Sequence, residues 1–462
     1  MTAEKNMTSG EVSVINDRSG TGRELAMLAV PLIISFVSQS IMGVVDIFII
    51  GKVGTAEQGG VGLGMGLFWG FECTFAGLAS VLTTFTAQSV GAGKIADVRR
   101  WLIAVLIAVL PFAVLLAFAA PLLGPILELA HTDASIRPHV ITYLGMLLLC
   151  MPFFLGGFVF ISFFRGIGDT VTPMVVAIVS NILNACLGIT FVFGLFGITP
   201  MGVRGVALAT VISVIFSVVL FVLKYLSNGL HAKYETRAKP IFFVADILRV
   251  MRVGFPIGAS WLLENLAFNI LTIYVATYDP ESLAANTIVF QLISFSFLPA
   301  VALSIAASTL VGQYLGAGRR DLARNSARAS IRFAVLFMGT VGICFLTFRH
   351  PLIAFFNADP KVVELGGKAL LLAAGFQIFD ALGITVDGIF RGAGYTLFPM
   401  VVRLVVMWVI FVPLIFILGS YTGSGITGGW TAALVAIFLQ GVIMFAAYRV
   451  VKWYDRKLVI GG

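Results

Sequence analysis

The chain has 462 residues, of which 59% are hydrophobic and 11% are charged, and its mean hydropathy is +1.03. Because a soluble protein carries about 25% charged residues, this composition excludes a soluble globular protein. The formal net charge of +8 is spread over short connecting segments, so it gives no indication of nucleic-acid binding.

Apolar runs of about 20 residues recur along the chain, and each is long enough to cross a bilayer as a helix. In chain order they cover residues 25–50, 60–86, 102–125, 138–163, 173–195, 202–226, 248–276, 284–311, 330–350, 364–390, 398–419 and 428–450. The sequence therefore predicts an all-α polytopic membrane protein with twelve transmembrane helices.

The basic residues predict the orientation of these helices. Lys and Arg gather at the N-terminus and in every second connecting segment, whereas the other segments hold only Lys52, Arg137, Arg204, Arg349, Lys361 and Lys368. Because basic segments stay in the cytoplasm during insertion, we expect both termini to be cytoplasmic and the protein to lie in the plasma (inner) membrane. The first 24 residues are polar and do not resemble a signal peptide, so the first helix is expected to direct insertion.

Two phrases return after about 225 residues. "AQSVGAGK" (87–94) reappears as "GQYLGAGR" (312–319), and "FFRGIGDTVTPMVV" (163–176) reappears as "IFRGAGYTLFPMVV" (389–402). Each half thus holds six predicted helices, and because six is even, both halves start on the same side of the membrane. A parallel pseudo-two-fold axis along the membrane normal is expected to relate two six-helix lobes, with a cavity between them.

The repeat and the polar segments also predict the domain boundaries. They are an N-terminal cytoplasmic tail (1–24), an N-lobe (25–226), a cytoplasmic inter-lobe linker (227–247), a C-lobe (248–450) and a C-terminal cytoplasmic tail (451–462).

Five acidic residues lie well inside apolar runs: Asp46, Glu72, Glu264, Asp380 and Asp387. Ionisable groups at this depth are rare and usually functional, because they must face protein or water and need partners. Of the basic residues, only Arg403 intrudes noticeably into a run. We therefore expect the missing partner to be a cation from outside the chain, which can be a proton, a metal ion or a cationic substrate.

Two of these acids reach a similar depth in the C-lobe. Glu264 lies ~22 Å along the seventh run and Asp380 ~24 Å along the tenth, at 1.5 Å per residue, and the two runs start from opposite faces. Asp387 follows Asp380 by seven residues, which returns it to nearly the same helix face, so both aspartates can line one path. The repeat places Gln39 opposite Glu264.

Structural roles are the alternative for three of the acids. Asp46 can lie at the outer interface, since its run ends at Gly51. Glu72 can hydrogen-bond to a neighbouring helix, and Asp387 can pair with Arg391 one turn later.

Two prolines stand at the same offset in the two halves, Pro31 in "LAVPLI" and Pro256 in "VGFPIG". Each lies early in the first helix of its lobe and removes a backbone hydrogen bond. Both are candidate hinges, and tolerated kinks are the alternative.

The residues that would indicate an enzyme or a structural metal are scattered. The four cysteines, Cys73, Cys150, Cys186 and Cys344, lie inside apolar runs at unrelated spacings. The four histidines form neither a zinc pattern nor a Ser-His pattern. We therefore expect no enzymatic activity and no bound cofactor.

The motifs together resemble those of the MATE (multidrug and toxic compound extrusion) transporters over essentially all twelve helices. The resemblance is carried by "MGVVDIFIIGKVG", "AQSVGAGK" and "FRGIGDTVTPM" with their repeats, "FPIGASWLLENL" and "FQIFDALGITVDGIFRGAG". An acid in the seventh helix together with one in the tenth looks most like the NorM branch.

The resemblance implies two lobes that form a V and export organic cations and amphiphilic drugs in exchange for inward Na⁺ or H⁺. It implies that Glu264 and Asp380 bind the coupling ion, as metal ligands if that ion is Na⁺, and that Asp46 matches the branch's acid in the first helix. Asn184 matches a polar position in the fifth helix, and Gln291 aligns loosely with a polar neighbour of the cation site. With Gln39 and Glu72, these two are the candidate polar residues of the substrate cavity, and the protein is expected to act as a monomer.

Three residues depart from the family pattern. Gly188 stands where many members have Asp or Asn, four residues after the Asn of the fifth helix, so a proton site built on that pair would be incomplete. Glu72 and Asp387 are not features of the branch, although Asp387 is retained as a candidate for cation coupling. A flippase for lipid-linked precursors has a related two-lobe plan and is the alternative; it would be expected to line its cavity with Arg and Lys.

Overall fold

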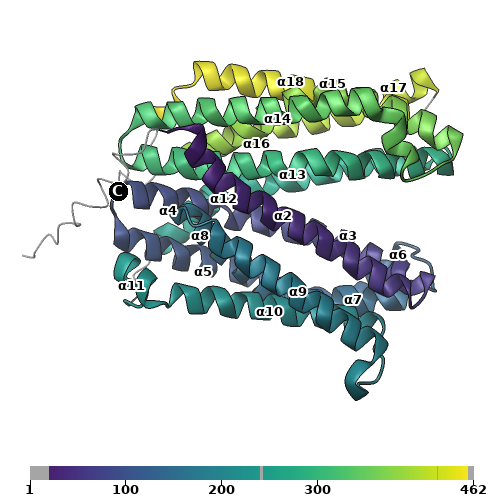
Figure 1. Cartoon of the computed structure of the whole chain (residues 1–462), viewed down its shortest axis with the longest axis horizontal. Coiled ribbons are helices and arrows are strands. Elements are labelled where there is room, and N and C mark those ends of the chain that lie inside the picture. The colour runs from purple at the N-terminus through teal and green to yellow at the C-terminus, as the bar shows by residue number, and fades with distance from the viewer. Residues whose placement is uncertain (1–19, 240–242, 424, 456–462) are drawn as a thin grey trace, which may run out of the picture. The chain divides into compact units, whose positions relative to one another are not determined.

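The computed structural model describes residues 20–239, 243–423 and 425–455, and every regular element in these ranges is helical (Figure 1). The first half of the chain contains α2 (Gly22–Gly51), α3 (Thr55–Ala79), α4 (Val81–Gly91), α5 (Ile95–Ala119), η1 (Ala120–Leu122), α6 (Leu123–Leu129), α7 (Arg137–Leu149), α8 (Met151–Ile167), α9 (Val171–Phe193), η2 (Leu195–Gly197), α10 (Val203–Tyr225) and α11 (Asn228–Tyr234). The second half contains α12 (Val244–Ala276), α13 (Pro280–Gly316), α14 (Arg320–Ala354), α15 (Pro360–Ala393), α16 (Leu397–Leu404), the π-helix η3 (Val405–Phe411), α17 (Val412–Thr422), α18 (Gly425–Val450) and η4 (Trp453–Asp455). Most of the two predicted tails lies outside the described residues.

The prediction of an all-α protein with twelve spans is confirmed. In the described part of the chain, eleven continuous helices or helix runs are long and apolar enough to cross a membrane, and α7 with α8 forms a twelfth span that is bent by 53°. The bend lies at Cys150, and Pro152 follows in the first turn of α8. Because proline lacks an amide hydrogen, α7 cannot continue straight through this point, and the fourth span is broken.

Packing divides the chain into two compact units. Of the described residues, 31–86, 94–239 and 243–258 form one unit, and 20–30, 87–93, 259–423 and 425–455 form the other. Three helices contribute to both units: α2 is divided between Val30 and Pro31, α4 between Thr86 and Ala87, and α12 between Gly258 and Ala259. The lobe boundaries drawn from the repeat stay a prediction.

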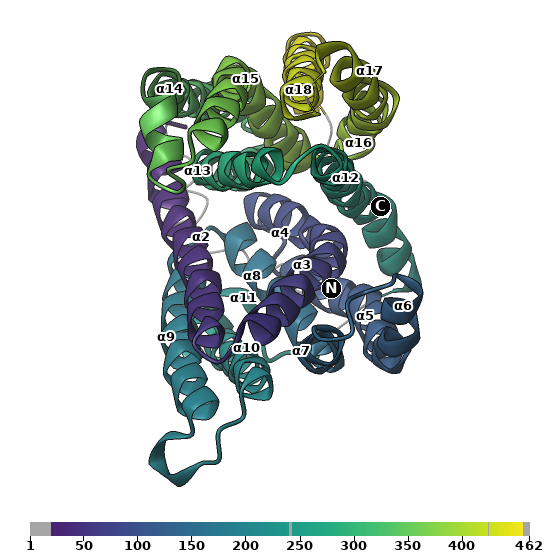
Figure 2. The same cartoon turned by 90° about the vertical axis from the view of Figure 1, so that its right-hand side faces the viewer.

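In the unit that holds the C-terminal helices, α15 packs against α13, α14 and α18, which run beside it in Figures 1 and 2. A Cβ atom at Gly388 or Gly392 of α15 would collide with the backbone of Ser304 or Ser308 on α13. The Ser304 hydroxyl also donates a 2.7 Å hydrogen bond to the carbonyl of Ile384. Small residues thus let the two helices approach closely, as is common where helices associate in a membrane.

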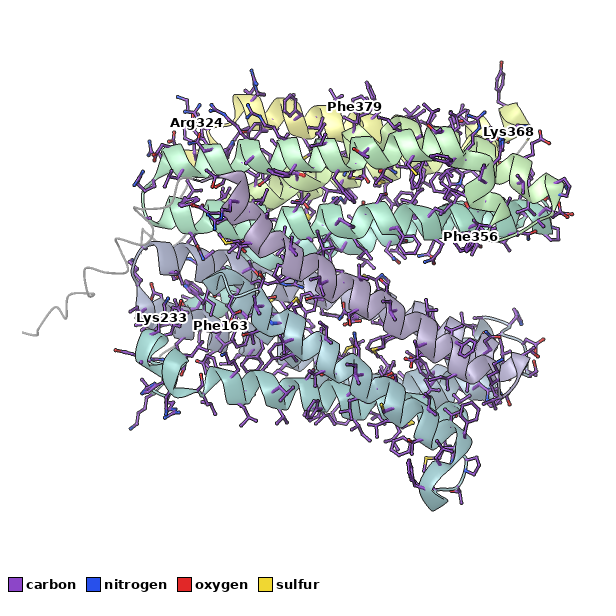
Figure 3. All side chains as sticks on the ribbon, viewed as in Figure 1. Phe163, Lys233, Arg324, Phe356, Lys368 and Phe379 are labelled. Carbon is purple, nitrogen blue, oxygen red and sulfur yellow. The ribbon has the colours of Figure 1, made fainter. Side chains whose placement is uncertain are left out.

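In the other unit, α10 packs against α7, α8 and α9, while α3 and α5 pack against α7 and α8. Aromatic rings fill this interior: Phe163, labelled in Figure 3, packs edge-on against Phe164 at 5.4 Å and against Tyr225 at 5.3 Å. The start of α12 is tied to α5, because Arg100 donates hydrogen bonds of 2.7 and 2.5 Å to the two carboxylate oxygens of Asp246.

The repeated "FRG" phrases end their helices in the same way. Gly168 ends α8 with φ 87° and Gly394 ends α15 with φ 83°. Only glycine adopts this left-handed conformation without a steric penalty. The repeat seen in the sequence therefore specifies the same turn in both halves of the chain.

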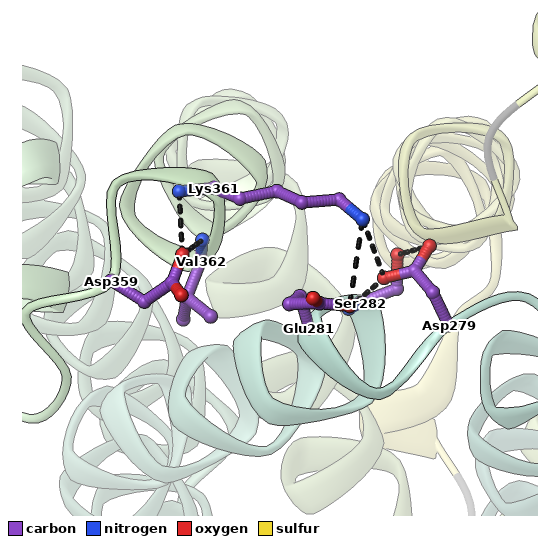
Figure 4. Close-up of polar contacts among 6 residues, drawn as sticks. All are labelled: Asp279, Glu281, Ser282, Asp359, Lys361 and Val362. Carbon is purple, nitrogen blue, oxygen red and sulfur yellow. Dashed lines mark hydrogen bonds and ion pairs between the residues drawn. The ribbon is translucent and has the colours of Figure 1, made fainter.

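The N-termini of α13 and α15 are capped and joined by one cluster (Figure 4). The Asp279 carboxylate accepts a 2.7 Å hydrogen bond from the amide of Ser282, and Asp359 accepts a 2.8 Å hydrogen bond from the amide of Lys361. The Lys361 ammonium lies 3.6 Å from Asp279 and 3.4 Å from Glu281. Lys361 thus links the starts of the two helices.

Candidate functional site

Glu264, the acid in the middle of α12, is paired with a cation from its own chain. The Arg403 guanidinium on α16 lies 3.1 Å from the Glu264 carboxylate, and both side chains are mostly buried, at 7% and 24% exposure. Each half of this pair comes from a different helix, which the sequence separates by more than a hundred residues. The contact was not predictable from local spacing.

Arg403 also reaches a second carboxylate. Its guanidinium lies 3.8 Å from Asp387 on α15, and Asp387 pairs in addition with Arg391 one turn further along that helix. The alternative considered for Asp387, a pair with Arg391, is therefore present. Asp387 is 6% exposed, so both ion pairs lie in the interior of the unit.

Asp380 lies in the same group without a close ionic partner among the described residues. Its half-buried carboxylate is near enough to Glu264 and Arg403 to interact with both charges. The group thus contains three carboxylates, of Glu264, Asp380 and Asp387, against the two guanidiniums of Arg391 and Arg403. If all five are ionised, the group carries one surplus negative charge.

This geometry corrects the expectation that the chain supplies no cation for its buried acids. The expectation is wrong for Glu264 and Asp387, because helix packing brings Arg403 and Arg391 to them. Arg403, the basic residue that the sequence places noticeably inside a run, is 6% exposed. Within this group, one carboxylate is left without a matching guanidinium.

Two tryptophans lie beside the charged group. The Arg391 guanidinium lies over the ring of Trp261 at 5.5 Å, and the indole nitrogen of Trp408 donates a 3.2 Å hydrogen bond to the Leu263 carbonyl, one residue before Glu264. The π-helical segment that contains Trp408 begins two residues after Arg403. A π-helical turn within an α-helix often marks a functional site.

A second buried polar group lies in the other unit and contains Asp46, which is 2% exposed. Asn184 donates a 3.2 Å hydrogen bond to the Thr210 hydroxyl, and Tyr143 interacts electrostatically with Asp46 and Glu72. Within the described residues, one carboxylate oxygen of Asp46 and the amide oxygen of Asn184 have no hydrogen-bond partner. Both oxygens can accept a hydrogen bond, and the Asp46 carboxylate can in addition take up a proton. Asp46 is thus buried among the helices of this unit, and the alternative that it lies at the outer interface stays a prediction.

The other candidates are two glutamines, two prolines and the position of Gly188. Gln39 on α2 and Gln291 on α13 are exposed, so the structure does not place them in either buried group. Pro31 and Pro256 are buried within α2 and α12. A Cβ added at Gly188 would make an ordinary van der Waals contact, at 3.4 Å from the end of the Ile49 side chain.

Sequence reasoning missed Tyr143 and Thr210, and it did not assign Arg403 to Glu264. A hydroxyl inside an apolar run carries no charge and occurs often without a role, so neither residue stood out. For Arg403 the signal was present, because a guanidinium inside a span needs an acidic partner, but the sequence does not say which acid is nearest.

The comparisons with known proteins agree with this architecture. The family model described as MatE matches the chain twice, over residues 31–190 and 256–417, so that the two matches begin at the paired prolines. A probable multidrug resistance protein NorM of Thermotoga maritima is 30% identical over 449 residues, which cover 95% of this chain and 94% of that protein. A probable multidrug resistance protein YoeA of Bacillus subtilis is 26% identical over 462 residues, which cover 98% of each. The solved structure of the eukaryotic MATE transporter AtDTX14 has a TM-score of 0.83 at 20% identity, covering 96% of this chain and 98% of that one.

Twelve spans in two repeated halves, with charged groups buried among the helices, define a polytopic protein of the membrane-transporter class. The chain belongs to the MatE family. The resemblance to MATE transporters, and to their NorM branch, is thereby confirmed.

Proposed function

We propose that this protein is a secondary active multidrug efflux antiporter that exports organic cations and other amphiphilic drugs in exchange for inward Na⁺ or H⁺. It acts as a monomer in the plasma membrane with both termini in the cytoplasm, and it uses no cofactor besides the coupling ion. The names of its relatives support the substrate class, since both describe multidrug resistance proteins.

The observation that carries the coupling is the surplus carboxylate in the C-terminal unit. A surplus charge in a low-dielectric interior is costly, and one monovalent cation near Glu264 and Asp380 balances it. Within the described residues, no three His, Cys, Asp or Glu side chains gather as a metal site. A bound Na⁺ would therefore complete its shell with backbone, hydroxyl or water oxygens, whereas a proton would need none.

In this proposal, Arg403 changes its ion-pair partner when the coupling cation binds. With no external cation bound, its guanidinium neutralises Glu264 at 3.1 Å. A cation that arrives between Glu264 and Asp380 weakens this pair by like-charge repulsion, and Arg403 is then held by Asp387, which already lies 3.8 Å away. The cation thus favours a different arrangement of α12, α15 and α16. A ligand shifts a conformational equilibrium by such a difference in affinity.

The group around Asp46 provides a second polar position, in the other unit. One carboxylate oxygen of Asp46 and the amide oxygen of Asn184 have no hydrogen-bond partner among the described residues. The Asn184 amide lies next to the Thr210 hydroxyl, and no basic side chain in the described part of the chain forms an ion pair with Asp46. A cationic or hydrogen-bond-donating drug is the ligand that such acceptors favour. The absence of a carboxylate at Gly188 leaves Asp46 to supply the charge alone.

Pro31 and Pro256 are proposed as hinges because the two compact units divide at or near them. The division of α2 falls directly before Pro31, and the division of α12 falls two residues after Pro256. Each proline removes a backbone hydrogen bond at that point. The Ser35 hydroxyl also bonds back to the Pro31 carbonyl at 2.8 Å, an arrangement that often bends helices.

The flippase alternative needs basic side chains that are available for a pyrophosphate. Arg403 is buried and Arg391 is half-buried, and both are engaged by carboxylates. Their pairing therefore favours a cation-binding group over an anion-binding one.

The test is efflux of ethidium from proteoliposomes, driven separately by a Na⁺ gradient and by a pH gradient. Wild type is compared with Glu264→Gln and Asp380→Asn, which remove one charge each at nearly constant volume. Glu364→Gln is the matched control, because it makes the same change at the exposed start of α15, where Glu364 pairs with Lys368 at 2.8 Å.

We expect one gradient to drive efflux, both buried-acid variants to lose that response, and the control to keep it. The gradient that works names the coupling ion. Efflux that neither gradient drives, or undiminished efflux in both variants, would contradict the proposal and make the buried acids structural. Transport of a lipid-linked precursor in place of ethidium would favour the flippase.

A further inference from the structure

A basic pocket of about 600 Å³ lies where α14 begins and α18 ends. Its charged residues are Arg324, Arg328, Arg332, Arg449 and Lys452, and its aromatic residues include Tyr448, Trp453 and Tyr454. Figure 3 shows Arg324 at one end of this unit and Lys368 at the opposite end. None of these residues belongs to the two buried polar groups.

The pocket concentrates positive charge without an internal counter-charge. In the described ranges of the chain, Arg328, Arg332, Arg449 and Lys452 form no ion pair with an acid, while the nearby Asp455 is engaged by Arg320 at 3.0 Å. The charges of Arg324, Arg328 and Arg449 all act on the Tyr448 hydroxyl, so they converge on one place. Like charges held together favour the binding of an anion.

Aromatic side chains line part of the pocket. Tyr448 stacks on Trp453 at 5.8 Å, and Trp453 is 2% exposed. The Arg324 guanidinium lies over the Tyr454 ring at 4.6 Å. Tyr and Trp are enriched where a span meets the headgroup region, which is the level expected for the end of α18.

The surface that continues from the pocket along the two helices is apolar. Leu336 follows Arg332 by one turn on α14 and is 70% exposed, while Val442, two turns before Arg449 on α18, is 42% exposed. A bound anion would thus sit directly above side chains that meet acyl chains. A free phosphate would use only the basic part of this surface, whereas an anionic phospholipid would use both parts.

We propose that this pocket binds the phosphate-bearing headgroup of an anionic phospholipid, whose acyl chains lie along α14 and α18. Basic pockets between helices at the cytoplasmic side of a membrane are suited to such headgroups. The site is separate from drug binding and from the coupling ion, so it stands whether or not the proposed antiport is correct.

The experiment measures quenching of tryptophan fluorescence in the purified full-length protein in a neutral detergent. The probes are phosphatidylglycerol and phosphatidylcholine with the same brominated acyl chains, and inorganic phosphate is added in a separate arm. The quenching measured for Trp453→Phe is subtracted from the quenching measured for wild type, and the remainder is the quenching of Trp453 at the pocket.

The test variant combines Arg328→Gln, Arg332→Gln and Arg449→Gln, and a second variant replaces the same residues by Lys. The matched control combines Lys224→Gln, Lys233→Gln and Arg252→Gln, which removes as much charge from exposed positions on α10, α11 and α12. If the triple Gln variant does not fold, Arg332→Gln alone provides the comparison.

We expect brominated phosphatidylglycerol to quench the Trp453-dependent fluorescence at concentrations at least about tenfold lower than phosphatidylcholine. The Gln variant should lose this preference, while the Lys variant and the control should keep it. Equal quenching by the two lipids, or an unchanged preference in the Gln variant, would overturn the proposal. Prevention of quenching by inorganic phosphate at the same concentrations as the lipid would assign the pocket to free phosphate and overturn the lipid assignment.

Discussion

At the scale of single residues, Arg403 sets the net charge of the group of buried acids. It is the shared partner of Glu264 and Asp387, at 3.1 and 3.8 Å, and it lies within electrostatic reach of Asp380. Without it, the group would hold three carboxylates against one guanidinium. One positive side chain therefore sets the surplus charge at a value that a single monovalent cation balances.

The first prediction concerns the loss of that charge. Arg403→Gln leaves Glu264 mostly buried without its ion pair, so we expect the free energy of unfolding to fall by about 1 to 3 kcal/mol. The double variant Glu264→Gln with Arg403→Gln removes both charges and should recover part of this loss. Thermal unfolding in detergent measures the effect, and a double variant less stable than Arg403→Gln would contradict the pairing.

At the scale of elements, the close approach of α13 and α15 depends on residues without bulk. Gly388→Ala places a methyl group against the Ser304 backbone, so we predict a loss of about 1 to 3 kcal/mol from overpacking. Gly375→Ala on the exposed side of α15 is the control, since its methyl group would lie 3.3 Å from the flexible end of Leu434. Unfolding measured under identical conditions should separate the two variants, and equal melting temperatures would show that α13 and α15 can move apart freely.

The capping cluster makes a prediction about pH. Partial burial acts to raise the pKa of Asp279, but hydrogen bonds from Ser282 and the charge of Lys361 outweigh it, so this pKa is below its ordinary value. A carboxyl group with a lowered pKa stabilises the folded state above its unfolded pKa of about 3.9, and the stabilisation is lost as the pH falls.

Asp279→Asn should therefore lower the free energy of unfolding by about 0.5 to 1 kcal/mol at pH 7, and the difference from wild type should shrink below about pH 4. Melting temperatures across this pH range provide the measurement. A difference that grows as the pH falls would have the wrong sign for a lowered pKa.

At the scale of the whole molecule, the two halves share a scaffold and differ in charge. The "FRG" arginines and their terminal glycines recur in both, yet Arg391 pairs with Asp387, while Arg165 lies near the rings of Phe36 at 5.5 Å and Phe158 at 5.9 Å. The position opposite Asp387 in the first half is Ile161. The halves thus keep the same turns and place their carboxylates differently, as expected if each has a separate task.

The orientation of the helices in the membrane is also a property of the whole molecule. In a background without the four natural cysteines, Ala358→Cys and Ala232→Cys place exposed thiols in the segment before α15 and in α11. Because basic residues gather around α11, we expect a membrane-impermeant maleimide to label Ala358→Cys on intact cells, and Ala232→Cys only after permeabilisation. The reverse pattern would invert the orientation and move the basic pocket of α14 and α18 to the outer face.

The sequence by itself determined the fold class, the number of spans and the internal repeat. These properties follow from run length, hydropathy and motif spacing, which are local or periodic, so they can be read without knowing how helices pack. The same signals selected Glu264, Asp380 and Asp387 as the acids to examine, because a charge inside an apolar run is conspicuous wherever the helix lies.

Only the tertiary structure decided what those acids face. Arg403 and Glu264 are far apart in the chain, and Tyr143 and Thr210 meet Asp46 and Asn184 through packing that leaves no periodic trace. The basic pocket likewise needs the start of α14 beside the end of α18. Electrostatic interactions depend on distance in space, and in a helical membrane protein that distance is set by which helix faces meet and not by separation along the chain.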